Sequence, residues 1–163
     1  MQTARLACVA ATAVALALSQ TPKPNFTGTW KADDSKTVVK TTPVKNPSED
    51  APEAPPPPPP EEQPPDVIEQ NGNDLRIGEQ TFTLDGKENI NPLGVEGMAH
   101  RSTTHWEGNK LVSDWALERD GQKLATGHRV RSLSGDGKTQ IVETHIETPR
   151  LIIDTHMVMV KQP

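Results

Sequence analysis

Residues 98–160 decide the fold, and they read MAHRSTTHWEGNKLVSDWALERDGQKLATGHRVRSLSGDGKTQIVETHIETPRLIIDTHMVMV. Short alternating runs rich in Val, Ile and Thr are separated here by turn sequences: Glu107-Gly108, Asp120-Gly121, Asp136-Gly137 and Thr148-Pro149-Arg150. Alternation with a period of two between such turns is typical of antiparallel hairpins. The pattern predicts a five-stranded meander with strands near 98–106, 110–118, 123–132, 139–147 and 151–160.

The turns also predict which residues face each other, because loop length determines the register of a hairpin. A two-residue type I′ loop at Asp120-Gly121 pairs Leu111 with Val130. The resulting register places three rows on one face of the sheet. The apolar rows are Trp106, Leu111, Val130, Val142 and Met157, and Ser102, Trp115, Thr126, Ile146 and Ile153. The row between them is Thr104, Ser113, His128, Thr144 and Thr155. The opposite face receives Arg101, Asp114, Glu118 with Lys123, Arg129 with Glu143, and His145 with Asp154.

A long meander with one apolar face must close on itself or be covered, because open strand edges aggregate. No stretch after residue 19 has a convincing helical period, so no helix is available as a cover. We therefore expect an all-β protein in which an antiparallel up-and-down meander closes into a barrel or half-barrel.

The first residues of the chain have the features of a secretory signal peptide. Arg5 precedes an apolar run at Leu6–Leu18, and Ala17-Leu18-Ser19 offers small residues to a signal peptidase. The run is too short to span a bilayer comfortably. We expect cleavage after residue 19, no stable membrane span afterwards, and a periplasmic or extracellular location for a single domain at 20–163.

A proline-rich block interrupts this domain at residues 43–65, which hold eleven of the sixteen prolines. Proline lacks a backbone donor and fixes φ, so the block cannot form a helix or a central strand. We interpret it as a disordered, solvated loop. The alternative is that it binds a protein partner that recognises proline-rich segments.

Composition and charge exclude several classes of function. The chain has 163 residues with 17 basic and 22 acidic side chains. Removal of Arg5 with the signal leaves 16 basic residues and a net charge of −6, which argues against binding nucleic acid or anionic membranes. The one cysteine, Cys8, lies in the signal segment, so the mature chain can form no disulfide or thiolate site. No cofactor or metal is expected.

Four segments resemble the lipocalin-like barrels of the calycin superfamily, including exported bacterial proteins of that kind. They are Phe26-Thr27-Gly28-Thr29-Trp30-Lys31, which contains a Gly-x-Trp motif, Leu84-Asp85-Gly86-Lys87-Glu88, Trp106-Glu107-Gly108-Asn109-Lys110-Leu111, and Leu133-Ser134-Gly135-Asp136-Gly137-Lys138-Thr139. The resemblance implies an up-and-down barrel that holds a small, mainly apolar molecule.

The sequence departs from that family at two places. Lipocalins set an arginine from the end of the barrel against the first-strand tryptophan, and the late arginine here is Arg150, at a turn. Fatty-acid-binding proteins carry an inward Arg and Tyr in the last strand, where this chain has Met157 and Met159. Capture of a carboxylate by that last-strand pair is therefore not expected.

The predicted binding residues line the inner face of the barrel. Trp106 and Trp115 are the expected apolar anchors, His128 is the expected central polar contact, and the row supplies hydroxyl groups. The full predicted set is Thr104, Trp106, Ser113, Trp115, Thr126, His128, Thr144, Thr155 and Met157. The favoured function is non-enzymatic binding of a small apolar or amphipathic molecule by an exported protein. The alternative is an interaction or structural module of the cell envelope with a packed interior.

Two other kinds of site have weaker support. Ser113 beside His128 would make a nucleophile–base pair, but no acid lies on that row to orient the histidine. A carboxylate–imidazole cluster on the outward face of the last hairpin is of a type that binds zinc. Its members are Glu143, His145, Glu147, Asp154 and His156. We interpret the cluster as cross-strand pairs on a solvated face.

Overall fold

The computed structural model describes residues 22–45 and 65–163. The predicted signal peptide and most of the proline-rich block, residues 46–64, lie outside the described residues. In the described ranges, the structure has no helix that is both long and apolar enough to cross a membrane.

The described residues form eleven antiparallel strands. The first six are β1 (Gly28–Ala32), β2 (Val38–Pro43), β3 (Asp66–Asn71), β4 (Asp74–Ile77), β5 (Gln80–Thr83) and β6 (Glu88–Pro92). The last five are longer: β7 (Met98–Glu107), β8 (Lys110–Arg119), β9 (Gln122–Leu133), β10 (Thr139–Glu147) and β11 (Leu151–Lys161).

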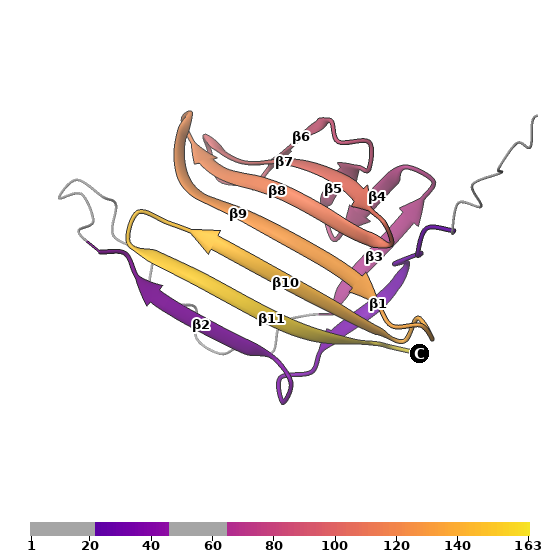
Figure 1. Cartoon of the computed structure of the whole chain (residues 1–163). Coiled ribbons are helices and arrows are strands. Elements are labelled where there is room, and N and C mark those ends of the chain that lie inside the picture. Colours follow the sequence, from indigo (N-terminus) through magenta and orange to yellow (C-terminus); the bar gives the residue numbers. More distant parts are fainter. Residues whose placement is uncertain (1–21, 46–64) are drawn as a thin grey trace, which may run out of the picture.

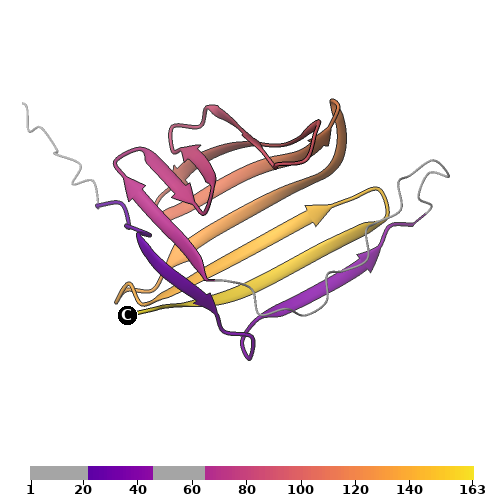
Figure 2. The same cartoon turned by 180° about the vertical axis from the view of Figure 1, so that it is seen from behind.

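The strands follow one another around a nearly closed barrel in the order β5-β4-β3-β1-β11-β10-β9-β8-β7-β6 (Figure 1). In the view from behind, the short strands β3, β4 and β5 lie in front of the long strands that form the opposite wall (Figure 2). The predicted five-stranded meander is confirmed, and every strand boundary agrees with the prediction to within one residue. Asp120 and Gly121 have φ values of 50° and 80°, as the predicted type I′ turn requires.

Strand β2 lies outside the continuous order of strands. The edge of β11 that faces away from β10 pairs with β1 at one end and with β2 at the other. Trp30 of β1 pairs with Lys161 at one end of β11, and Pro43 of β2 pairs with Leu151 at the other. Asp66, where β3 begins, pairs with Trp30. Pro43 and Asp66 therefore lie near opposite ends of β11. From Leu151 to Lys161 the strand spans roughly 30 Å at about 3.4 Å per residue, so the described residues on either side of 46–64 are about that far apart.

The apolar core lies between β1 and β3–β5 on one side and β8, β10 and β11 on the other. Its buried members are Phe26, Trp30, Ile68, Leu75, Phe82, Leu84, Leu111, Val142 and Met159. The indole Nε1 of Trp30 donates a hydrogen bond of 2.8 Å to the carbonyl oxygen of Phe26. The ammonium of Lys161 lies 5.5 Å from the centroid of the Trp30 ring. A cation from the end of the barrel therefore covers the first-strand tryptophan, and it is Lys161 and not an arginine.

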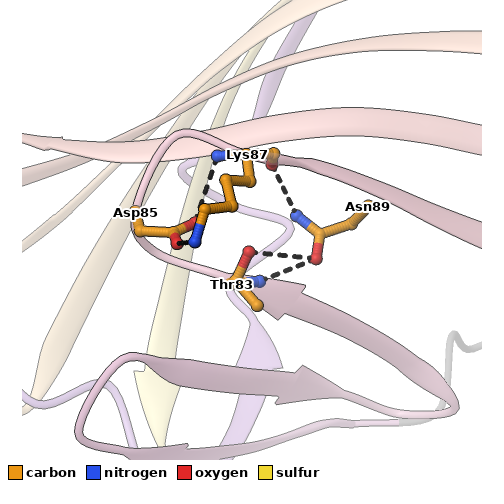
Figure 3. A network of polar contacts seen from close by, with 4 residues as sticks. All are labelled: Thr83, Asp85, Lys87 and Asn89. Atoms are coloured by element: carbon orange, nitrogen blue, oxygen red, sulfur yellow. Dashed lines mark hydrogen bonds and ion pairs between the residues drawn. The ribbon is translucent and has the colours of Figure 1, made fainter.

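The barrel has one seam, between β5 and β6, where no ladder of backbone hydrogen bonds forms. Side-chain amides of β6 cross it instead. Asn91 accepts a bond of 2.8 Å from the backbone N–H of Thr81 and donates one of 2.9 Å to its carbonyl. Asn89 accepts a bond of 2.9 Å from the backbone N–H of Thr83, beside the turn in which Asp85 pairs with Lys87 (Figure 3). These amides satisfy backbone groups that a neighbouring strand would otherwise pair.

Candidate functional site

The register between β8 and β9 differs from the predicted one by a single residue. Next to the turn, Glu118 pairs with Lys123 as predicted. A bulge lies between Leu117 and Glu118, and beyond it, away from the turn, Leu111 pairs with Arg131 and not with Val130. One extra residue in a strand moves every later side chain of that strand to the other face. The bulge therefore reverses the predicted orientation of β9 from Ala125 onward.

The reversal corrects the predicted roles of His128 and Thr126. His128 pairs with Asp114 on the outer face, where its Nδ1 lies 2.8 Å from the Asp114 carboxylate. Its side chain is half exposed, so it is not a polar contact inside the barrel. Thr126 and Val130 also turn outward, and Glu143 pairs with Val130 and not with Arg129. The inward positions of β9 belong to Gly127, Arg129, Arg131 and Leu133.

The other predicted site residues do lie on the inner face. Thr104 pairs with Ser113, and their hydroxyls are 2.9 Å apart. Thr144 pairs with Thr155. The nucleophile–base pair of Ser113 and His128 does not form, because the two side chains are on opposite faces of the sheet.

The two predicted anchor tryptophans occupy different places. Trp106 stacks on Phe26 with ring centroids 6.0 Å apart and packs against the core. Trp115 lies over Gly127, close enough that a Cβ at that position would overlap the indole ring. It also stacks on His100 at 5.4 Å. Trp115 is therefore near the inward arginines of β9, but neither Trp106 nor Trp115 is among the residues that line the cavity described next.

A cavity of about 360 Å³ lies between β1, β3–β5 and β9–β11, and we call it the arginine chamber. This volume is at the small end of the range for sites that hold small molecules. Its apolar wall comes from Trp30, Ala32, Ile77, Val142, Met157 and Met159. Its polar wall comes from Asp66, Gln80, Arg129, Arg131, Thr144 and Thr155. Thr144, Thr155 and Met157 are the members of the predicted set that the fold brings together here.

Two arginines of β9 line this chamber. The sequence analysis predicted that Arg129 faces outward, and it did not consider Arg131. Arg131 is 7% exposed, and its guanidinium donates a bond of 2.9 Å to Oε1 of the fully buried Gln140. Burial is the main cause that lowers the pKa of Arg131 to about 10, and the charge of Arg129 adds to it. Burial also lowers the pKa of Arg129, whose Nε donates a long bond of 3.4 Å to Thr144.

Neither arginine has a carboxylate in ion-pair contact among residues 22–45 and 65–163. Asp66 lines the same chamber, and its charge slightly offsets the lowering of both pKa values. Each guanidinium has five N–H donors, and each makes one hydrogen bond in the described part of the chain. Arg129 is half-buried, and its guanidinium lies 6.0 Å from the centroid of the Trp115 ring. Arg131 is buried, and burying a charge without a counter-charge costs several kcal/mol, so this arrangement is unusual for a purely structural interior.

A second group of polar atoms lies beside the arginines, on β7 and β8. His100 Nδ1, Ser102 Oγ and Trp115 Nε1 are buried and have no hydrogen-bond partner in the described ranges. No guanidinium nitrogen of Arg129 or Arg131 is among these sealed, unpaired atoms. Burial and the nearby charge of Arg129 lower the pKa of His100, which keeps its imidazole neutral near pH 7.

The outer face of β10 and β11 carries ionic pairs, as predicted. His145 Nδ1 lies 2.6 Å from Asp154, and its Nε2 lies 3.3 Å from Glu147. The bond to Asp154 is the main cause that raises the pKa of His145. His156 lies 3.6 Å from Glu143. Within the described ranges, no three His, Cys, Asp or Glu side chains are grouped closely enough to hold a metal ion.

No protein-family model matches the chain, and no curated protein matches it significantly.

Proposed function

We propose that the protein binds a small amphipathic molecule in the arginine chamber, without catalysing a reaction on it. The observation that carries this proposal is a cavity of about 360 Å³ with one apolar wall and one polar wall inside a nearly closed barrel. A concave, largely apolar site with a few placed polar groups is the usual form of a small-molecule site.

Two further features support a lipocalin-like binding protein. The Gly28-Thr29-Trp30 motif opens β1, and Lys161 covers the Trp30 ring as an arginine does in that family. The leading segment at residues 1–19 has the pattern of a secretory signal, so we propose that the protein acts outside the cytoplasm.

Strand β2 favours a second candidate, an interaction module of the cell envelope. Among the described residues β2 pairs only with β11, so its other edge is available to a further strand. Val38 and Val39 are each 61% exposed. An exposed strand edge with apolar side chains is a place where another chain can add a strand.

A neutral dye separates the two candidates. The full-length protein is titrated with N-phenylnaphthylamine, whose fluorescence rises in an apolar site. We expect saturable binding, and we expect Thr155→Trp to abolish it by filling the chamber. His156→Trp is the matched control, because the adjacent residue on β11 points to the outer face.

Absence of saturable binding would reject the chamber as a site and favour the interaction module. Equal dye binding by the two variants would place the dye elsewhere on the protein, with the same consequence. Circular dichroism of both variants verifies that they are folded.

A further inference from the structure

We propose that the ligand of the arginine chamber is an amphipathic monoanion, whose head group Arg129 and Arg131 hold while its apolar part lies against Trp30, Ile77 and the methionines of β11. This inference rests on the proposed function and adds the chemical class of the ligand. A carboxylate, sulfonate or sulfate head group would satisfy it equally.

The first argument is the charge that the fold leaves uncompensated. Two guanidinium groups enter an interior where neither has a carboxylate partner in the part of the chain that the structure describes. Desolvated cations are strongly destabilising unless an anion or water replaces their hydration. An anionic head group would supply the missing counter-charge and accept several of the free N–H groups at once.

The second argument is the position of the two side chains. Arg129 and Arg131 are two residues apart on β9, so they project from the same face about 7 Å apart along the strand. Both line the arginine chamber, and Thr144 and Thr155 lie next to them with hydroxyl groups that can donate to the same head group. Arginine matches planar oxyanions because its N–H groups form a rigid fork.

The third argument is the net charge of the chamber, which selects a monoanion. The formal charges of the two arginines and Asp66 sum to +1, because two positive charges less one negative charge leave one. The imidazole of His100 is neutral at pH 7 and does not change that sum. A single negative charge therefore neutralises the chamber, whereas a dianionic phosphate monoester would leave an excess negative charge next to Asp66.

The apolar wall of the chamber determines the chemistry of the part of the ligand beyond its head group. Val142 and Met159 are buried, and Met157 packs against the same core cluster. Methionine side chains adapt to the shape of a neighbour because they are unbranched and flexible. This wall fits a short alkyl chain or a small aromatic group and offers no hydrogen bonds to it.

A matched pair of dyes tests the inference. Anilinonaphthalene sulfonate is N-phenylnaphthylamine with one added sulfonate, so the ratio of their affinities reports the contribution of the negative charge. We expect the full-length protein to bind the sulfonate roughly 10- to 100-fold more tightly, as one or two hydrogen bonds to a charged group imply.

Three variants locate that preference. Arg129→Met should bring the ratio close to one, and Asp66→Asn should raise it by removing the competing carboxylate. Arg101→Met is the control, because Arg101 forms ion pairs with Glu88 and Glu118 on the outer face. It should leave the ratio unchanged. Asp66→Asn keeps the test decisive if Arg129→Met does not fold.

The outcomes separate this inference from the proposed function. Saturable binding of both dyes with a ratio near one, or a high ratio that survives in Arg129→Met, would overturn the monoanion while leaving a ligand-binding chamber. Failure of both dyes to bind would overturn the proposed function and the inference together.

Discussion

Replacing Arg131 by methionine and Gln140 by leucine in one protein is expected to stabilise it. Arg131 is nearly fully buried, and burial lowers its pKa to about 10. The lowered pKa means that folding penalises the charged guanidinium by an amount on the order of 3 kcal/mol. Because pH 7 lies below the pKa in both the folded and the unfolded state, the side chain is charged in both, and this whole cost is present at neutral pH.

The second substitution matters because Gln140 is fully buried and its Oε1 accepts the hydrogen bond from Arg131. Arg131→Met alone leaves that oxygen unpaired, at a cost of about 1–3 kcal/mol, which cancels most of the gain. The single variant should therefore have nearly the stability of the natural protein. The double variant should gain about 2 kcal/mol, within the range of about 1–4 kcal/mol found when apolar residues replace buried charges.

Urea denaturation at pH 7, followed by circular dichroism, measures these differences. The protein is first unfolded and refolded to remove any bound anion, because a ligand would stabilise the arginine form. Arg101→Met is the control for loss of an exposed cation and should change the free energy of unfolding by less than about 1 kcal/mol. A double variant that is less stable than the natural protein would show that Arg131 is a stabilising part of the interior, and the reasoning would be refuted.

Three further outcomes follow from the structure. Gly127→Ala should lower the free energy of unfolding by about 1–3 kcal/mol, because its methyl group would overlap the Trp115 indole; urea denaturation with near-ultraviolet circular dichroism measures both effects. Asp154→Asn should lower the pKa of His145 in an NMR titration, and the small stabilisation from that pair should be present below about pH 6.5 and vanish as pH rises through the raised pKa. Replacing residues 46–64 by an equally long Gly/Ser linker should leave the melting temperature within a few degrees, whereas outright deletion should detach β2, since the joined ends must span roughly 30 Å.

The sequence predicted the meander well because its information is local. Each strand of residues 98–160 has alternating apolar side chains, and each turn contains a residue type that its backbone conformation needs. Asp120 and Gly121 show this most directly, since both adopt positive φ. Two of the four predicted hairpin registers are confirmed, with Trp106 opposite Leu111 and Val142 opposite Met157. The two registers of β9 are each wrong by one residue, because Arg131 and not Val130 lies opposite Leu111 and Val142.

The predicted site failed at β9, which is shifted by one residue against both of its neighbours. A bulge at Leu117/Glu118 changes its register with β8, and Val142 of β10 pairs with Arg131 and not with Val130. In the segment from Gly127 to Arg131, alternate side chains lie on opposite faces of the strand. One face has His128 and Val130 and the other has the two arginines, and the sequence alone allows either face to be the inner one. The pattern favoured burying the valine. The signal that could have suggested the true register is Gly127, because a glycine within a strand often marks the close approach of another group, here the Trp115 ring.

The sequence by itself therefore determined the all-β class, the order and bounds of the five long strands, and the outward pair of His145 with Asp154, because these follow from local turns and from alternation. The tertiary structure alone decided which face of β9 is inside, and with it the chemistry of the interior. A one-residue bulge costs little locally, but it exchanges a histidine for two arginines in the chamber. The gain or loss in free energy depends on Trp115 of β8 and on Gln140 and Thr144 of β10, which contact β9 only when the strands have paired and their inner faces are packed.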